Sequence, residues 1–292
     1  MTYVGRFAPS PTGALHLGSL VAGLASYLDA RAANGRWLLR IEDLDPPREQ
    51  PGAGDLILAT LEAFGFEWDA DAVWQHTRLE AYAQALDLLQ EGQHVYPCVC
   101  ARKSFSGAYP GRCRSRNFAK TKEPYAIRMR VPEGTVTFSD RLIGPVTFDW
   151  SAIGDFIVRR KDTFFAYQLA VVVDDIASQV SHVIRGNDLL NSTPRQLTLY
   201  TALEATQPTF GHCATVVHDE GGKLSKQTGA KAVDPNNPGP TLLAALSCLG
   251  QDTAGINPAA PVAEIMGASI SRWDPTRAGF AQTVNASGKA VV

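Results

Sequence analysis

The amino-acid sequence has no long hydrophobic run and no strong excess of charge. Its most apolar stretch, residues 167–173, is far shorter than the roughly 18 apolar residues of a membrane-spanning helix. The first residues show no basic segment followed by an apolar one, so the pattern of a secretory signal peptide is absent. The sequence therefore predicts a cytoplasmic protein without membrane contact.

Net charge and cysteine content are both low, and each limits the classes of protein that fit. A net charge of −2 excludes a protein that binds polyanions over its whole surface, so any nucleic-acid contact must come from a local patch. The chain has five cysteines, an odd number, and three of them fall between positions 98 and 113. In a reducing compartment this clustering indicates a metal site rather than disulfides.

Strands and helices alternate along most of the chain. The patterns predict strands at 3–7, 36–43, 180–185 and 214–218, and helices at 17–33, 51–66, 77–91, 194–205 and just after residue 165. Strands separated by helices pair in parallel through right-handed crossovers. We therefore expect an α/β fold with a doubly wound, Rossmann-type parallel sheet.

Two segments depart from this alternation. Residues 125–160 have the pattern of short antiparallel strands, and the stretch before them is rich in cysteine, glycine and basic residues. We expect a catalytic domain split over 1–95 and 166–240 and a metal-bearing insertion at 96–165. A short helical carboxyl-terminal segment, 241–292, is expected to end in a mobile tail.

The stretch RFAPSPTGALHLGSL (6–20) places two prolines, two glycines and a histidine between a predicted strand and a predicted helix. Unpaired backbone N–H groups and the helix dipole make such a helix start a potential anion site. Gly13 and Gly18 let a ligand approach the backbone, and His16 offers a hydrogen bond to a phosphate. Taken alone, the stretch fits an ordinary turn equally well.

A second stretch, GGKLSKQTGA (221–230), sets Lys223 and Lys226 among glycines. Such a loop can fold over a triphosphate and stabilise the charge of a departing pyrophosphate without a covalent step. Lysines in a glycine-rich loop are, on their own, more often simply solvated. The stretch becomes informative only together with the first one.

Together, PSPTGALHLGS and KLSKQ resemble the HIGH and KMSKS signatures of class I aminoacyl-tRNA synthetases. The words RFAPSPTG, RIEDLD and VIRGND resemble the glutamyl/glutaminyl branch of that family, and the resemblance extends over roughly residues 3–230. The chain departs from the signatures at Ser19, where they have histidine, and at Gln227, where they have serine. The resemblance implies a ligase that forms an aminoacyl-adenylate from ATP, with Mg²⁺ accompanying the nucleotide.

The resemblance also implies which residues contact the nucleotide. His16, Gly18, Ser19 and Lys226 correspond to the ATP-binding residues of the family. Lys226, Lys223 and His16 correspond to catalytic residues that stabilise charge on the phosphates. The expected catalytic machinery therefore comes from two loops that are far apart in the sequence.

A chain that ends at residue 292 is expected to lack the anticodon-reading region of a full glutamyl-tRNA synthetase. It resembles a truncated paralogue family, understood to activate L-glutamate without tRNA and to attach it to queuosine, the modified wobble base of tRNA-Asp. A globule of this length has a radius of gyration of about 19 Å, too small to hold an anticodon while serving the distant acceptor end. Two alternatives remain: a catalytic fragment that charges the acceptor end of tRNA-Glu, and a non-catalytic tRNA-binding paralogue.

Glutamate carries two carboxylates and one ammonium group, so a specific pocket needs two cations and one carboxylate. Arg6, Arg185 and Glu42 all end predicted strands, at the edge where ligands of parallel sheets bind. The resemblance adds further glutamate contacts: Phe7, Ala8, Pro9, Ser10 and Tyr167. The sequence leaves open which arginine binds which carboxylate, and whether Arg6 and Glu42 instead form a structural ion pair.

Cys98, Cys100 and Cys113 are candidate metal ligands. Three thiolates and a fourth ligand make a closed tetrahedral site, typical of structural Zn²⁺. Residues 95–181 contain no histidine that could be the fourth ligand. The paralogue family shows a C-x-C…Y-x3-C pattern, and the resemblance implies Tyr109 as that ligand. Three free thiols in a loop are the alternative.

Basic residues gather around these cysteines. Between positions 102 and 122 there is no acid, and aromatic residues are interleaved with seven basic ones: Arg102, Lys103, Arg112, Arg114, Arg116, Lys120 and Lys122. Such a stretch indicates contact with RNA phosphates, and the resemblance points to the anticodon loop of tRNA-Asp; a solvated loop is the alternative. The acidic pair Asp174-Asp175 is expected at the surface. Nothing in the sequence demands more than a monomer.

Overall fold

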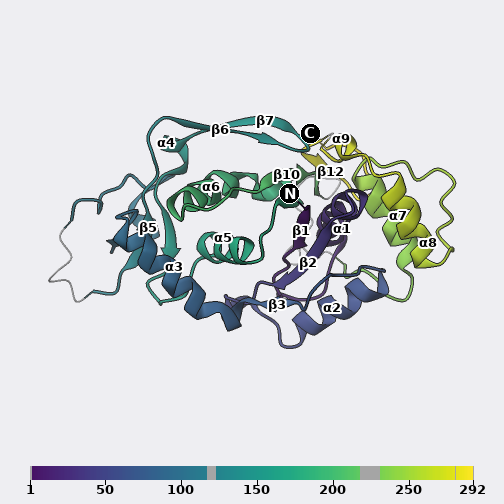
Figure 1. The fold of residues 1–292 in the computed structure, drawn as a ribbon, viewed down its shortest axis with the longest axis horizontal. Coiled ribbons are helices and arrows are strands. Elements are labelled where there is room, and N and C mark those ends of the chain that lie inside the picture. Colours follow the sequence, from purple (N-terminus) through teal and green to yellow (C-terminus); the bar gives the residue numbers. More distant parts are fainter. Residues whose placement is uncertain (1, 117–122, 218–230, 280, 292) are drawn as a thin grey trace.

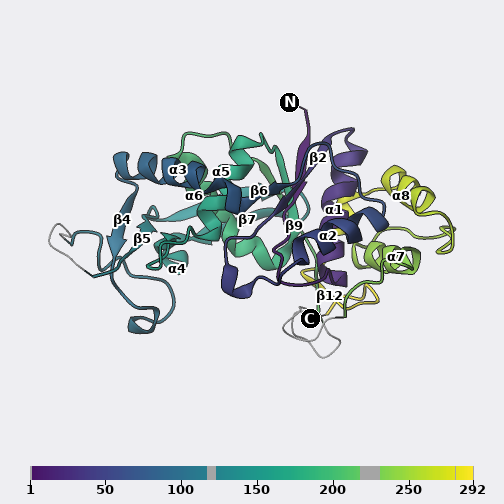
Figure 2. The same cartoon turned by 90° about the horizontal axis from the view of Figure 1, so that it is seen from below.

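The structure is a computed structural model that describes the chain except for residues 1, 117–122, 218–230, 280 and 292. Parallel strands occupy its centre, and an antiparallel region extends from one end to a hairpin that runs alongside the centre (Figure 1). Helices of the carboxyl-terminal segment lie at the other end. The view from below shows the same order (Figure 2). Across the described residues, no helix combines the length and the apolar character needed to cross a membrane.

The centre of the fold consists of short strands in parallel pairs. They are β1 (Val4–Phe7), β2 (Arg36–Ile41), β3 (Val73–Trp74), β9 (His182–Gly186) and β10 (Thr209–Cys213). β2 pairs with both β1 and β3, and β9 pairs with β10. Ser181 joins the two groups, because its N–H donates to Val4 O at 2.9 Å and its hydroxyl accepts from Val4 N at 2.8 Å. The predicted α/β architecture with parallel strands is confirmed.

Helices cover these strands and begin or end at recognisable local signals. They are α1 (Leu17–Ala32), α2 (Ala53–Ala63), α3 (Leu79–Glu91), α5 (Tyr167–Ala177) and α6 (Thr193–Ala202). α1 begins after His16, whose ring accepts the N–H of Ser19 at 3.3 Å. It ends before Asn34, whose φ of 51° turns the chain toward β2. Gly35 follows because a Cβ there would lie 2.7 Å from Tyr3 O.

The region predicted as antiparallel strands has that structure. β5 (Ala126–Met129) pairs with β4 (Val95–Cys98) and β8 (Phe156–Arg159), while β6 (Thr135–Asp140) and β7 (Gly144–Asp149) form a hairpin that leads into α4 (Trp150–Ile153). Val158 of β8 shares a hydrophobic core with Tyr82 of α3 and Leu169 of α5. A second core contains Leu24 of α1 and Trp37 of β2. The antiparallel strands therefore pack directly onto helices of the parallel part.

The strand predicted at 214–218 is displaced in the structure. The main strand, β10, ends at Cys213, and only β11 (Thr215–Val216) follows it. Gly211 and His212 interrupt the apolar pattern of β10, which is why the prediction missed it. Both residues are buried, and Asp140 of the hairpin accepts the N–H of His212 at 3.1 Å.

The carboxyl-terminal segment contains more elements than the sequence predicts. They are α7 (Pro238–Cys248), α8 (Val262–Ser271), α9 (Pro275–Ala278) and β12 (Thr283–Val284), which pairs in parallel with β11. Within the tail, Asn285 N donates to Lys289 O at 2.9 Å and Val291 N to Thr283 O at 3.0 Å; its mobility stays a prediction. Four 3-10 turns occur elsewhere among the described residues: η1 (Pro46–Arg48), η2 (Gln75–Arg78), η3 (Arg102–Ser104) and η4 (Asn187–Ser192).

Candidate functional site

A cavity of about 580 Å³ opens where β1, β2 and β9 end. The described residues that the sequence predicts for glutamate or ATP all line it: Arg6, Phe7, Ala8, Pro9, Ser10, His16, Gly18, Ser19, Glu42, Tyr167 and Arg185. The two other predicted residues, Lys223 and Lys226, lie outside the described residues. Segments that are distant in the sequence therefore converge on one cavity.

The loop after β1 brings the start of α1 to this cavity. Pro9 O accepts the N–H of Glu42 at 3.0 Å, which holds the loop against the end of β2. Gly13 has a φ of +134°, a conformation that L side chains rarely adopt. Gly18 and Ser19, in the first turn of α1, line the cavity. The positive end of the helix dipole therefore favours an anion there.

His16 links the first loop to the chain that follows residue 230. It is the N-cap of α1, and its backbone forms a β-bridge with Ala232. Its neighbour Leu15 accepts the N–H of Val233 at 3.0 Å. The first described residues after the KLSKQ stretch therefore lie beside the helix start that lines the cavity.

Glu42 is the carboxylate of the predicted glutamate site. Its Oε1 accepts a hydrogen bond from Arg40 Nη2 at 3.3 Å. Burial raises the pKa of Glu42, while Arg40 and Arg6 oppose the shift. Among the described residues, Arg40 is the one cation within 4.0 Å of this carboxylate. The structural Arg6–Glu42 ion pair is therefore not formed.

Arg6 instead pairs with an aspartate that the sequence predicts at the surface. Asp175 is 3% exposed, and its Oδ1 lies 3.3 Å from Arg6 Nε and 2.7 Å from Arg40 Nη1. Burial would raise the pKa of Asp175, but the two guanidinium groups outweigh it and lower the pKa. Asp174 is buried too, and it accepts hydrogen bonds from Gln75, Arg78 and Tyr82. The surface prediction for this pair is wrong, because β1, β2 and α3 cover this side of α5.

Arg185 is a buried cation with uncharged partners. It is 4% exposed, and it donates to His212 Nε2 at 3.0 Å, to Gln196 Oε1 at 2.8 Å and to Thr193 Oγ1 at 2.8 Å. Burial lowers the pKa of Arg185 and also that of His212. In the part of the chain that the structure describes, no carboxylate oxygen lies within 4.0 Å of this guanidinium. The cavity therefore presents a positive charge without a close protein counter-ion.

The cavity also has a wall that sequence reasoning missed. Its members include Ile184, Gly186, Asp188, Leu189, Ala214, Thr215 and Val216. Asp188 N donates to Thr215 Oγ1 at 3.0 Å, which ties the segment after β9 to the segment after β10. Ligands of parallel sheets usually bind at the carboxyl ends of the strands. The residues that follow the predicted strand in VIRGND could therefore have been predicted to line the cavity.

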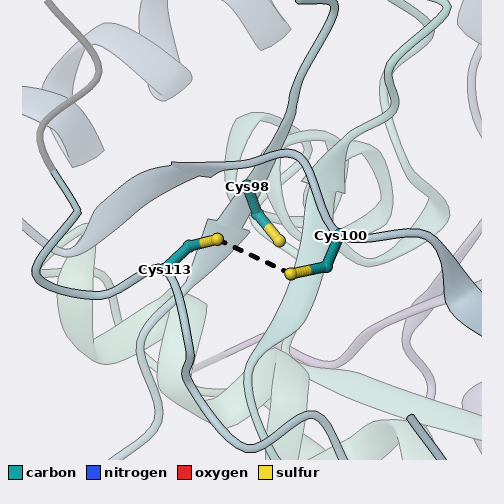
Figure 3. A group of neighbouring side chains, drawn as sticks. All are labelled: Cys98, Cys100 and Cys113. Atoms are coloured by element: carbon teal, nitrogen blue, oxygen red, sulfur yellow. Dashed lines mark hydrogen bonds between the residues drawn. The ribbon is translucent and has the colours of Figure 1, made fainter. Parts of the chain in front are cut away.

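The three cysteines predicted to bind metal converge on one point (Figure 3). Their sulfur atoms all lie within 4.8 Å of one another, and Cys100 Sγ is 3.6 Å from Cys113 Sγ. The Tyr109 hydroxyl lies 3.3 Å from Cys98 Sγ and 3.5 Å from Cys100 Sγ. Tetrahedral ligands at about 2.3 Å from a metal are about 3.8 Å apart. The cluster therefore fits a metal ion.

Arg128 contacts this cluster, although no sequence pattern singles this residue out. Its Nε donates to Cys98 Sγ at 3.3 Å, and its guanidinium carbon lies 4.0 Å from the centre of the Tyr109 ring. Arg128 therefore contacts two of the candidate ligands, Cys98 and Tyr109, and helps to hold their side chains in place.

The basic residues around the cysteine cluster differ in their surroundings. Lys103, Arg112 and Arg116 are exposed. Arg114 instead forms an ion pair with the buried Asp155. Part of the stretch therefore holds the insertion together, while the exposed cations remain at the surface.

Comparison with known proteins identifies the family. The model described as "tRNA synthetases class I (E and Q), catalytic domain" matches residues 3–108 and 111–239. The chain is 48% identical over 278 residues to a glutamyl-Q tRNA(Asp) synthetase of Pseudomonas putida (strain GB-1), covering 94% of each chain. It is 46% identical over 280 residues to that of Pseudomonas aeruginosa (strain LESB58), covering 94% of this chain and 95% of the relative. This chain belongs to the glutamyl-Q tRNA(Asp) synthetase family.

Solved structures with the same fold are longer than this member of the glutamyl-Q tRNA(Asp) synthetase family. A glutamate tRNA ligase from Elizabethkingia meningosepticum, crystallised in complex with its amino acid, matches with a TM-score of 0.81 and 25% identity. The match covers 99% of this chain and 68% of that one. A glutamate-tRNA synthetase from Elizabethkingia anophelis has a TM-score of 0.79 at 24% identity and shows the same fold, over 100% and 68% of the two chains.

Proposed function

We propose that the chain activates L-glutamate with ATP in the absence of tRNA and transfers the glutamyl group to queuosine at the wobble position of tRNA-Asp. The charge pattern of the cavity is the observation that carries this proposal. Arg185 lacks a carboxylate partner among the described residues, Arg6 lines the same cavity, and Glu42 supplies one anion. Glutamate offers the complementary set of two carboxylates and one ammonium group. Tyr167 and the loop residues Phe7, Ala8, Pro9 and Ser10 complete the proposed glutamate site.

In the proposed reaction ATP occupies the part of the cavity beside the start of α1, on a Rossmann-type sheet. His16, Gly18 and Ser19 bind its phosphates; when bound with the nucleotide, Mg²⁺ would offset phosphate charge. An oxygen of the glutamate α-carboxylate forms a bond to the α-phosphorus, while the bond from that phosphorus to pyrophosphate breaks. Lys226 and Lys223 stabilise the negative charge that moves onto pyrophosphate. The product is glutamyl-adenylate, from which the glutamyl group passes to tRNA while AMP leaves.

We assign structural Zn²⁺ to the cluster of Cys98, Cys100, Cys113 and Tyr109. Three sulfur donors and one oxygen donor at mutual distances near those of a tetrahedral site support this assignment, and four protein ligands leave no open position for catalysis. When bound, the ion would join two segments of the insertion. The exposed basic residues beside it would then bind RNA phosphates close to the anticodon loop.

We further propose that the enzyme acts as a monomer, because the proposed reaction requires no residue from a second chain. ATP and tRNA are cytoplasmic substrates, which supports a cytoplasmic enzyme.

ATP–pyrophosphate exchange without tRNA tests the activation step. Exchange that depends on glutamate is expected. Absence of glutamate-dependent exchange would overturn the proposal in favour of a non-catalytic tRNA-binding paralogue. Labelled glutamate with tRNA-Asp that contains or lacks queuosine tests the transfer step. Transfer only to the queuosine-containing tRNA is expected, whereas charging of tRNA-Glu would indicate reaction at the acceptor end.

A further inference from the structure

Arg185 is held by a chain of buried side chains that the proposed reaction does not otherwise use. Arg185 Nε donates to His212 Nε2 at 3.0 Å, and His212 Nδ1 lies 2.5 Å from Asp140 Oδ2. His212 is 0% exposed and Asp140 is 3% exposed. The three residues lie on β9, β10 and β6, so the contact runs from the parallel strands to the hairpin.

The hydrogen bonds determine the tautomer of His212. Burial would raise the pKa of Asp140, but His212 and backbone N–H groups outweigh it and lower the pKa, so the carboxylate is ionised and can only accept. His212 must therefore carry its proton on Nδ1, which leaves Nε2 as an acceptor. Burial lowers the pKa of His212, which keeps a second proton off Nε2 near neutral pH.

This tautomer is the one that Arg185 needs, because a guanidinium group has donors only. If His212 carried its proton on Nε2, two N–H donors would face each other across 3.0 Å. Arg185 also donates to Gln196 and Thr193, so uncharged acceptors use three of its five N–H groups. The other two N–H groups, one on each terminal nitrogen, have no partner among the residues that the structure describes. Such a pair matches a carboxylate that binds with both oxygens.

We propose that His212 and Asp140 are positioning residues for glutamate recognition, which hold Arg185 through a neutral acceptor and present its two remaining N–H groups to a substrate carboxylate. The inference rests on the proposed function. A carboxylate in place of His212 would hold Arg185 equally well but would neutralise its charge. The imidazole ring avoids this, because it keeps the negative charge of Asp140 one ring further from the guanidinium group.

The substitution Asp140→Asn changes the tautomer of His212 while keeping the shape of the site nearly the same. Asparagine can still accept the N–H groups of Leu142 and His212, but its amide group donates to His212 Nδ1 and moves the ring proton to Nε2. We expect the KM for glutamate in ATP–pyrophosphate exchange to rise about tenfold to a hundredfold, as for one lost hydrogen bond to a charged group. The KM for ATP should stay within about twofold of wild type. Nitrogen-15 NMR of His212 should show Nδ1 protonated in the wild type and Nε2 protonated in the variant.

Substitutions of His212 test the acceptor directly. His212→Gln retains an oxygen acceptor for Arg185 and should recover most of the glutamate affinity that His212→Leu loses. His182→Asn is the matched control, because His182 lies on the same strand as Arg185 but stacks on the Tyr3 ring outside the cavity. It should leave both KM values unchanged. Should Asp140→Asn fail to fold in a thermal unfolding assay, the two His212 variants still decide.

The outcomes distinguish this inference from the proposed function. Wild-type protein without glutamate-dependent exchange would refute the proposed function. Wild-type protein with such exchange, but with an unchanged KM for glutamate in folded Asp140→Asn and His212→Leu, would overturn the inference alone. A wild-type His212 protonated at Nε2 would overturn it as well. So would a fall in kcat at constant KM for glutamate, because it would give these residues a different role.

Discussion

A buried arginine with only uncharged partners is costly unless something else compensates its charge. Moving a guanidinium group out of water costs on the order of several kcal/mol, as it does for other ions. Hydrogen bonds and opposite charges can offset this desolvation cost. Arg40 is compensated by Asp175 and Glu42, both within 4.0 Å. Arg185 has the hydrogen bonds without the anion among the described residues. An anionic substrate would supply the charge that is missing.

Arg185→Lys should weaken glutamate binding although it keeps the charge. A lysine replaces the forked donor with a compact ammonium group, so the two-point contact to a carboxylate and the orienting hydrogen bonds are lost together. We expect the KM for glutamate to rise at least about tenfold, with the KM for ATP within about twofold of wild type. ATP–pyrophosphate exchange measures both values. Arg141→Lys, which alters an arginine paired with Asp29 outside the cavity lining, is the control.

The opposite result has a clear meaning for this site. An unchanged KM for glutamate in Arg185→Lys would remove the guanidinium group from the proposed pocket. A parallel rise in the KM for ATP would instead indicate a general disturbance of the cavity.

Glu42 should give glutamate binding a pH dependence. Burial raises the pKa of Glu42, with Arg40 and Arg6 opposing the shift and Asp175 adding to it. The ionised form is needed to bind an ammonium group, so the KM for glutamate should rise as the pH is lowered through the range above the ordinary glutamate side-chain pKa of about 4.3. Glu42→Gln should show a high KM that changes less over the same range, and a wild-type KM that does not change with pH would contradict the prediction.

Some residues of this site can be predicted from the sequence because the pattern that identifies them lies in one short stretch, and others cannot because their partners are distant in the sequence. Arg6 and Arg185 could be predicted because each ends a strand in a recognisable stretch. His212 lies 27 positions from Arg185 and 72 from Asp140, and Asp175 lies 169 positions from Arg6. A single sequence gives no sign that such polar residues meet. Buried aspartates and histidines are therefore predicted at the surface, because the sequence does not show the distant partners that they contact in the folded protein.

At the scale of elements, local sequence patterns predicted helices and strands correctly. Elements that depend on contacts between residues far apart in the sequence were not predicted. The cysteine spacing predicted the cluster, because Cys98, Cys100 and Cys113 lie in one short stretch. The helices and the antiparallel strands followed from periodicity for the same reason. β10 was misplaced because its polar His212 is stabilised by Asp140 on a distant hairpin. Strand position there depends on a tertiary contact that hydrophobic patterning does not contain.

The metal cluster should stabilise the insertion more than the parallel strands. Wild-type protein should contain about one zinc ion per chain when measured by inductively coupled plasma mass spectrometry. The Cys113→Ser variant should lose most of this zinc. Loss of metal should speed tryptic cleavage within the basic stretch, because the loop loses its internal link. Hydrogen exchange of the amides of α1, in the core around Trp37, should change little.

Two variants sharpen the metal test. Tyr109→Phe removes only the phenol oxygen and should lower zinc affinity while keeping the three thiols. Cys248→Ala changes a buried cysteine outside the cluster and should retain zinc. Wild-type protein purified without zinc, and unable to take it up, would contradict the assignment.

At the scale of the whole molecule, the proposed activation and docking regions lie apart. The cavity opens where the central strands end, whereas the basic stretch belongs to the loops next to β4 and β5 at one end of the molecule (Figures 1 and 2). The carboxyl-terminal helices α7 and α8 lie at the opposite end. Activation of glutamate and docking of tRNA should therefore respond to different substitutions.

Alanine at Lys103, Arg112 and Arg116 together should impair transfer to tRNA while leaving activation intact. These exposed cations would contact RNA phosphates, and each contact adds to the dependence of binding on salt. We expect kcat/KM for tRNA to fall about tenfold or more at about 0.15 M salt, and the slope of log affinity against log salt to decrease by about 2. Glutamate-dependent ATP–pyrophosphate exchange should stay at the wild-type rate. The control variant carries alanine at three exposed cations of the carboxyl-terminal segment: Arg272, Arg277 and Lys289. Equal losses in both variants would mean that net charge, rather than a docking surface beside the cysteine cluster, governs tRNA binding.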